Sequence, residues 1–383
     1  MPYQVTFDSF PSGIALTAAK KGGKVKVGIM GFSSSEDGDK FIKQLEGFPN
    51  VVLNRLPSSA RITASTIDHL LAVIRKDKTA TIYVNEIDFL LRIRSKKSVK
   101  KGGTIYQDDI ADIERLELGN IQIANDAAII FVFSIGWRKG LFFDVGPLQS
   151  EPILRKYNLE SLLGSYYSYL SFQHLFKITE EEWQCLFDQQ WFPFITLKSS
   201  TVQAMLAYMR NRWQVDDLLN KIADEASQSL PIMLERWKGN SFLQPHFELI
   251  KYAADRYIEK DYVSATAILY TRIEGVMRGV HRETGTKEKA SPKNLAKSVT
   301  DYQRSISFRN SLLLPPMFQR YLEEVYFKNF EPDRPAKLSR YSVAHGTAIP
   351  SDFSLKAATI GLLIIDQIFF FLPPGATRMT AQK

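Results

Sequence analysis

Cysteine is almost absent from this sequence, which contains a single residue of this type, Cys185. One thiol cannot form a disulfide within the chain, so a disulfide framework is excluded as a source of stability. We therefore expect the reducing environment of the cytoplasm. The apolar neighbours of Cys185 predict a core position, where cysteine behaves as a small hydrophobic residue.

The sequence also lacks an export signal and a membrane span. Its first residues contain no basic segment followed by an apolar run, so no signal peptide is expected. The most apolar stretch, residues 357–372, is shorter than the ~20 residues that cross a bilayer. Asp366 and Gln367 interrupt this stretch. We expect a buried helix there, a soluble protein and no membrane partner.

Motifs for metals and cofactors are missing as well. His69, His174 and His246 are scattered without the spacing of metal ligands. Gly22-Gly23 is not followed by the Lys-Ser/Thr pair of a phosphate-binding P-loop. We therefore predict no metal and no cofactor.

The residues that are present predict an α+β protein in several parts. A chain of 383 residues exceeds the ~250–300 residues at which single cores stop growing. We predict an α+β domain at 1–148 that senses or binds a trigger, a helical connector at 149–236, an all-α domain at 237–375 and a loose tail at 376–383.

The first segment is rich in strand signals. Short runs of β-branched and aromatic residues, separated by glycines and polar residues, are typical of strands. They occur at 24–30, 80–84, 89–94, 127–133 and 140–146. Helical spacing of apolar residues predicts two helices within this domain, at 37–45 and 65–76.

The remainder of the chain has apolar residues at intervals of three and four, which predicts helices. Residues 200–236 predict one or two of them, and Asp261 is a suitable N-cap for a helix that ends near Arg282. Pro292 and Asp352 mark the starts of two more helices. Several helices with short connections form a bundle.

One segment of this bundle indicates a function. Residues 337–346 read KLSRYSVAHG, so four residues separate Arg340 from His345. An acidic helix with an aromatic end precedes the segment at 321–330, and the apolar helix follows it. Residues 265–275, ATAILYTRIEG, predict an earlier helix that carries an acidic residue.

In this context the C-terminal third of the chain resembles the HEPN superfamily, in which four to six residues separate a catalytic arginine from a histidine. The resemblance implies a ribonuclease domain with Arg340 and His345 as the catalytic pair, and a role in bacterial antiviral or toxin-like defence. Family enzymes bring motifs from two protomers to one cleft, so a homodimer is implied. Tyr341 stands where many active members have a small polar residue or histidine, and its phenol can donate a hydrogen bond.

These two residue types suit RNA cleavage without a metal. The 2′-hydroxyl attacks the neighbouring phosphate and leaves a cyclic phosphate end, so one group accepts a proton and another protonates the leaving oxygen. Histidine can do either because its unperturbed pKa is ~6.5. A guanidinium can grip two phosphate oxygens and stabilise their extra charge. The alternative is that His345 bonds a carbonyl at a helix end and that Arg340 is a surface charge.

Helical geometry restricts how the pair can act. On a regular helix, Arg340 and His345 point about 140° apart. They converge through the reach of the arginine, through a distorted turn, or across two chains. Gly346 would suit a bend directly after the histidine.

Three further residues are candidates for supporting the pair: Glu274, Tyr341 and Asp366. An acid among apolar residues is costly unless it is paired. Glu274 either pairs with Arg278 at the surface of its own helix or positions Arg340 or His345. Asp366 needs a partner in the same way, and Arg340 is a candidate.

A basic stretch in the first domain is the predicted nucleic-acid contact. The net charge of +8 favours an anionic partner. Contacts to phosphate would be sensitive to salt and indifferent to sequence, although a solvated loop is the simpler interpretation. The residues are Arg92, Arg94, Lys96, Lys97, Lys100 and Lys101.

We therefore predict a metal-independent endoribonuclease that acts on RNA and is held in check until an unknown trigger binds the first domain. Two alternatives remain. The bundle could be a catalytically silent module for dimerisation or partner binding, or the chain could be a regulator that binds nucleic acid through its basic loops.

Overall fold

The computed structural model describes most of the chain and divides it into two compact units. The predicted tail at 376–383 lies outside the described residues. The described ranges are 2–58, 62–63, 66–306, 310–329 and 338–373.

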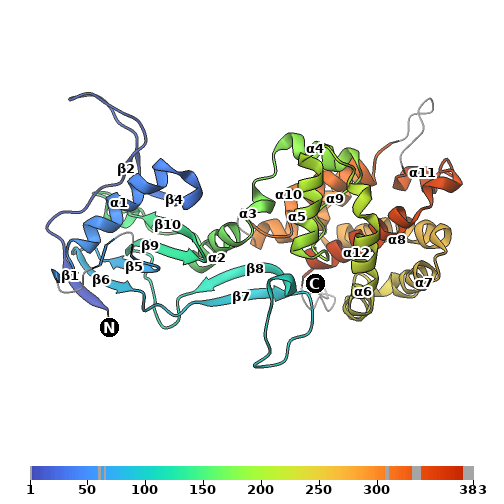
Figure 1. The fold of residues 1–383 in the computed structure, drawn as a ribbon, viewed down its shortest axis with the longest axis horizontal. Helices are drawn as coiled ribbons and strands as arrows, with labels where there is room; N and C mark the ends of the chain where they lie inside the picture. Colours follow the sequence, from blue (N-terminus) through green and yellow to red (C-terminus); the bar gives the residue numbers. More distant parts are fainter. Residues whose placement is uncertain (1, 59–61, 64–65, 307–309, 330–337, 374–383) are drawn as a thin grey trace. The chain divides into compact units, whose positions relative to one another are not determined.

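The first unit comprises residues 1–92 and 113–173 and is built on a six-stranded antiparallel sheet (Figure 1). Its strands lie in the order β1-β6-β5-β9-β10-β4. They are β1 Tyr3–Thr6, β4 Met30–Ser34, β5 Leu70–Ile74, β6 Thr79–Val84, β9 Ala128–Ile135 and β10 Arg138–Asp144. The short strands β2 Ile14–Ala15 and β3 Val27–Gly28 form a separate pair.

Each face of this sheet packs against one helix. Successive side chains of a strand point to opposite faces, and both sets in β9 are apolar. Ile130 and Val132 pack in one cluster with residues of α1, Asp39–Leu53. Phe131 and Phe133 pack in a second cluster with residues of α2, Leu159–Ser171. Continuous apolar runs therefore become strands that are buried on both sides.

Four of the predicted strands are confirmed: 80–84 as β6, 89–94 as β7 Leu90–Ser95, 127–133 as β9 and 140–146 as β10. The helix predicted at 37–45 is confirmed as the start of α1. The helix predicted at 65–76 is wrong, because Leu70–Ile74 form the fully buried strand β5 between β6 and β9. A short apolar run has no clear period and fits a buried strand as well as a helix.

The second unit comprises residues 93–112 and 174–383 and is helical apart from the tip of a β-hairpin. The hairpin consists of β7 Leu90–Ser95 and β8 Ile110–Glu117. The helices are α3 Gln173–Phe176, α4 Glu180–Asp188, α5 Ser199–Arg210, α6 Leu219–Lys238, α7 Phe247–Ile258, α8 Tyr262–Glu283, α9 Pro292–Ile306, α10 Pro315–Tyr321, α11 Arg340–Ala344 and α12 Leu355–Phe371. A π-helical turn, Leu322–Tyr326, continues α10.

The α+β class is confirmed, with the strand-rich part first and the helical part second. The division into units differs from the predicted segments: it falls after Gln173, and the hairpin tip 93–112 belongs with the helices. The carboxylate of Asp112 accepts hydrogen bonds from Ser311 Oγ at 2.7 Å and Leu312 N at 3.0 Å, which ties the tip to the helical unit.

Helix α12 forms the centre of the second unit, where it contacts α6, α7, α8 and α9. It is apolar nearly all round, as expected for a helix buried in a core. Its N-cap is Ser354, so the prediction of Asp352 in that position is wrong. Asp352 instead accepts a hydrogen bond from Ile349 N at 2.9 Å, in the preceding turn. Among the described helices, none has the length and apolar character needed to cross a bilayer.

One buried charge sits in this apolar helix. Asp366 is fully buried and accepts hydrogen bonds from Arg236 Nη2 at 2.6 Å, Trp237 Nε1 at 3.1 Å and Thr196 Oγ1 at 2.6 Å. Arg236 and Trp237 belong to α6, so the carboxylate joins α12 to α6. The proposed partnership of Asp366 with Arg340 is wrong, because these nearer groups satisfy its carboxylate.

We expect Asp366→Asn to lower the free energy of unfolding by about 3 kcal/mol, because it leaves the buried guanidinium of Arg236 without its counter-charge. Urea unfolding followed by circular dichroism measures this change. Asp224→Asn on α6 is the matched control, since Asp224 is exposed, and should change stability by less than about 0.5 kcal/mol. Equal effects of the two variants would show that the Asp366 network does not stabilise the unit.

Candidate active site

Arg340 and His345 lie at the two ends of one short helix, α11. The helix begins after Ser339, whose hydroxyl accepts a hydrogen bond from Ser342 N at 3.3 Å, while Ser339 N donates to Ser342 Oγ at 2.9 Å. This reciprocal capping fixes the first turn. His345 is the last residue of the turn, and Gly346 has a φ of +69°. The predicted bend at Gly346 is confirmed.

The arginine of this pair is bound to a buried carboxylate. Glu274 of α8 is 6% exposed, and its Oε2 forms an ion pair with Arg340 Nε. Its Oε1 forms a second ion pair with Arg278 Nη2 at 2.7 Å. Both of the alternatives considered for Glu274 therefore occur together: it pairs along its own helix and it holds Arg340.

A buried phenol lies near Glu274. Tyr326, in the π-helical turn, is buried and donates a hydrogen bond from its phenol to the carbonyl of Tyr270 at 2.6 Å. Burial, and then the negative charge of Glu274, raise the pKa of Tyr326 well above its usual value. This phenol is therefore neutral and acts as a hydrogen-bond donor.

Tyr341 contacts both members of the pair. The guanidinium carbon of Arg340 lies 5.0 Å from the centre of the Tyr341 ring. The ring of His345 is parallel to that of Tyr341, with 4° between their planes and 5.9 Å between their centres. His345 is exposed, and Arg340 and Tyr341 are partly buried. The sequence predicted that Tyr341 could donate a hydrogen bond from its phenol. The contacts described above are instead made by its ring.

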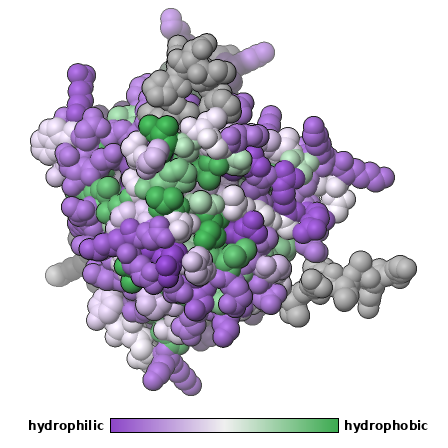
Figure 2. Space-filling view, turned by 90° about the vertical axis from the view of Figure 1, so that its right-hand side faces the viewer, coloured by the Kyte–Doolittle hydropathy of each residue, from purple (hydrophilic) through white to green (hydrophobic). Residues whose placement is uncertain are grey.

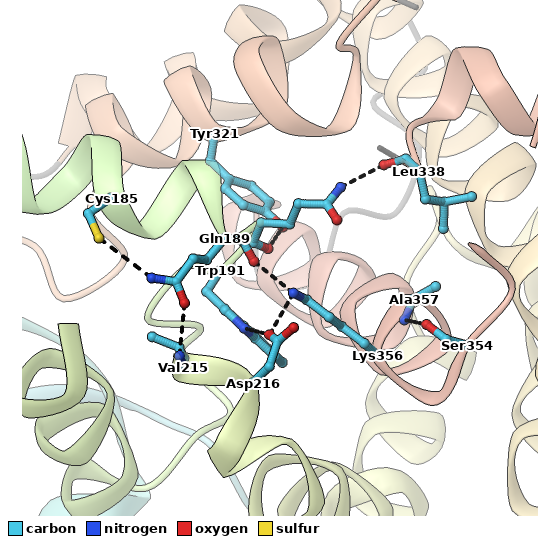
Figure 3. A network of polar contacts seen from close by, with 11 residues as sticks. Cys185, Gln189, Trp191, Val215, Asp216, Tyr321, Leu338, Ser354, Lys356 and Ala357 are labelled. Carbon is cyan, nitrogen blue, oxygen red and sulfur yellow. Dashed lines mark hydrogen bonds and ion pairs between the residues drawn. The ribbon is translucent and has the colours of Figure 1, made fainter. Parts of the chain in front are cut away.

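A polar network supports the start of α11 (Figure 3). Gln190 donates from its amide to the carbonyl of Leu338 at 2.8 Å, and the carbonyl of Gln190 accepts from Tyr321 at 3.0 Å. Next to it, Lys356 donates to the carbonyl of Gln189 at 2.9 Å. These contacts fix Leu338, two residues before Arg340.

The same network uses one carboxylate twice. Asp216 Oδ1 accepts from Trp191 Nε1 at 2.7 Å and pairs with Lys356 Nζ at 2.6 Å (Figure 3).

Cys185 is partly buried and accepts a long hydrogen bond of 3.5 Å from Gln189. The cysteine therefore lies at the edge of the core rather than fully inside it.

The two acids proposed to support the pair, Glu274 and Asp366, lie at different sites. Glu274 contacts Arg340, whereas Asp366 contacts Arg236, Trp237 and Thr196. Of the two, Glu274 alone meets the requirement for positioning the candidate pair. Tyr326 and the Gln190 network were missed from the sequence, because both depend on contacts between residues far apart in the chain.

The predicted nucleic-acid stretch is only partly accessible. Arg94 donates to the carbonyl of Leu372 at 3.1 Å, and the ammonium of Lys96 lies 3.4 Å from the carbonyl of Leu197. These two cations are partly buried and bonded to carbonyls of the helical unit, so they are less accessible to a polynucleotide than a solvated loop would make them. Of the remaining cations, Lys97 is partly buried in the same way, and the exposed ones are Arg92, Lys100 and Lys101.

Two of these remaining cations are paired. Arg92 pairs with Glu117 at 2.9 Å and Lys97 pairs with Asp109 at 2.8 Å. In the described part of the chain, no group of three or more His, Cys, Asp or Glu side chains is arranged to hold a metal.

No protein-family model matches the chain, and neither a curated protein nor a solved structure does so. The chemistry of the site is therefore argued from its geometry.

We expect Glu274→Gln to lower the free energy of unfolding by about 1–3 kcal/mol, because the change removes the charge that two guanidinium groups share in a buried position. Chemical denaturation measures the effect. Glu283→Gln at the exposed end of the same helix is the control and should be close to neutral. If both variants unfold at the same denaturant concentration as the parent, Glu274 does not hold Arg340 in solution.

Proposed function

We propose that this chain is a metal-independent endoribonuclease of the HEPN type, with Arg340 and His345 as its catalytic residues. The observation that carries the proposal is the buried Glu274, which holds Arg340 on the same short helix as the exposed His345. The ion pair restrains the guanidinium at the start of the helix that His345 ends. We further propose a cytoplasmic role in bacterial anti-phage or toxin-like defence, with a trigger that binds the first unit.

The reaction assigns one task to each group. The 2′-oxygen forms a bond to phosphorus, and the bond from phosphorus to the 5′-oxygen breaks, which gives a cyclic phosphate and a 5′-hydroxyl. His345 accepts the proton of the 2′-hydroxyl or donates one to the leaving oxygen. Arg340 stabilises the negative phosphorane through its terminal nitrogens, since its ion pair with Glu274 uses Nε. Glu274 is a positioning residue.

A homodimer is part of the proposal. The face of the helical unit at the right-hand end of Figure 1 carries a band of apolar residues among hydrophilic ones (Figure 2). The helices α7 and α8 contribute exposed apolar side chains, with Ile258 57% and Val263 54% exposed. Contiguous exposed apolar surface favours association. This surface therefore supports pairing of two chains through α7 and α8.

We expect Arg340→Ala and His345→Ala each to slow RNA cleavage by at least about 100-fold, the usual loss when a charge-stabilising or proton-transferring group is removed. The assay follows a labelled RNA in the presence of chelator and analyses the product ends for cyclic phosphate. Arg282→Ala at the exposed end of α8 is the control and should cleave as the parent does.

Arg340→Lys separates catalysis from folding. A lysine keeps a positive charge beside Glu274 but lacks the fork that grips two oxygens, so cleavage should fall while the unfolding midpoint stays near that of the parent. If the Arg340 and His345 variants cleave RNA as well as the parent, the catalytic assignment is wrong. The bundle then acts as a silent dimerisation or binding module.

The dimer has its own test, which is the mass in solution measured by light scattering. We expect the parent at twice the chain mass and Ile258→Asp/Val263→Asp at the mass of one chain, because two carboxylates cannot be buried unpaired in an apolar interface. Leu16→Asp, at an exposed apolar position of the first unit, should remain a dimer. A monomeric parent at all concentrations would exclude the homodimer.

A further inference from the structure

A second basic cluster lies in the helical unit, around a cavity of about 370 Å³. This volume is within the range of small-molecule sites, roughly 300–1,000 Å³. Three segments form the wall: the end of β7 with the residues that follow it, the C-terminal end of α6, and the C-terminal end of α12. The lining includes Arg94, Lys96, Arg236, Asn240, Phe369 and Phe370.

Two aromatic rings hold the arginines of this wall. The guanidinium carbon of Arg94 lies 5.3 Å from the centre of the Phe370 ring, and that of Arg236 lies 5.0 Å from the same centre. Both also lie within 5.9 Å of the centre of the Phe369 ring. A guanidinium that is stacked on a ring keeps its N–H donors at its edge, away from the ring face.

Internal hydrogen bonds set the direction of both side chains. Arg94 donates to the carbonyls of Phe370 and Leu372 at the end of α12. Arg236 donates to the carbonyl of Lys96 and to Asp366. The site is therefore ordered before any ligand binds, which lowers the entropic cost of binding.

Positive charge exceeds negative charge in this wall. Arg94, Lys96, Lys97 and Arg236 line the cavity. Two carboxylates pair with these four cations, Asp366 with Arg236 and Asp109 with Lys97. Arg236 Nε is buried and has no hydrogen-bond partner among the described residues. A buried donor without a partner is costly, and an anion in the cavity would supply that partner.

The ammonium of Lys96 also makes a weak hydrogen bond. Its hydrogen bond to the carbonyl of Leu197 is 3.4 Å long. Burial lowers the pKa of Lys96 to about 8, although Asp108, Asp366 and Asp109 act in the opposite direction. Arg236 contributes to the lowering. A nearby anion would favour the charged ammonium and raise this pKa again.

We propose that this cavity binds a small organic phosphate of the size of a mononucleotide. The phosphate would lie among Arg94, Lys96 and Arg236, and the apolar or flat part of the ligand would pack near Phe369, whose ring is partly exposed. A cavity with cations in its wall suits a compact ligand better than it suits a polynucleotide, which needs a continuous exposed groove. The site does not depend on RNA cleavage by Arg340 and His345.

Calorimetric titration of the full chain tests the proposal, with AMP, ADP, ribose 5-phosphate and inorganic phosphate as probes. We expect AMP or ADP to bind more tightly than inorganic phosphate, because they add contacts to the ring of Phe369. Lys96→Met should weaken this binding at least tenfold, because it removes one cation at nearly constant volume. Lys100→Met, an exposed change in the same loop outside the cavity, should bind as the parent does.

Proton uptake provides a second readout that a structural role of Lys96 would not produce. With a pKa of about 8, the ammonium is about half charged at pH 8, so phosphate binding at this pH should take up as much as about half a proton per site. Titrations in buffers of different ionisation enthalpy measure this uptake. It should disappear in Lys96→Met and persist in Lys100→Met.

Three outcomes would overturn the proposal: no probe binds at millimolar concentration, Lys96→Met binds as the parent does, or an oligoribonucleotide binds through Lys96 more tightly than every mononucleotide. The last result would make the cavity part of an RNA-binding surface. Because the Arg340 and His345 variants should still bind AMP or ADP, failure of this proposal is distinguishable from failure of the ribonuclease.

Discussion

Two buried carboxylates determine how several helices of the helical unit are joined, because each carboxylate must pair with a cation. Asp366 is fully buried and Glu274 nearly so, and each lies on a helix whose neighbours are largely apolar. A buried charge of this kind is tolerated only when it is paired and hydrogen-bonded. Each carboxylate therefore fixes an arginine that comes from another helix, Arg236 for Asp366 and Arg340 for Glu274.

The two pairs have different consequences for the surface. The Asp366 pair joins α12 to α6 and turns Arg236 toward Lys96 and the cavity beside it. The Glu274 pair joins α8 to α11 and turns Arg340 toward the exposed end of a short helix. In both cases a group that stabilises the core also presents a guanidinium at a concave or exposed position. The proposed recognition of anions would therefore depend on residues that also stabilise the core, and a change in either acid would affect both.

The sequence predicted the parts of this arrangement that depend on local pattern. Alternating or continuous apolar runs identified β6, β9 and β10, and Asp261 caps α8 as expected, accepting a hydrogen bond from Ser264 N at 3.1 Å. The local pattern gave a wrong prediction for residues 70–74, which form a strand and not part of a helix. A short apolar run has neither the helical period nor the strand period. It also failed for Asp366, whose partner Arg236 lies 130 positions away in the chain. The basic run around Lys96 resembled a solvated loop, and only tertiary packing turns part of it inward.

The two ion pairs of Glu274 affect whether Arg340 can bind a phosphate. A single carboxylate paired with a single arginine has no net charge and attracts an anion weakly. Glu274 pairs with both Arg278 and Arg340, so the three groups together carry one net positive charge. The ion pair also restrains the arginine, so that less side-chain entropy is lost when a phosphate binds. Tyr341 adds a rigid ring between the guanidinium and the imidazole. The ring of Tyr341 therefore contacts both candidate catalytic groups.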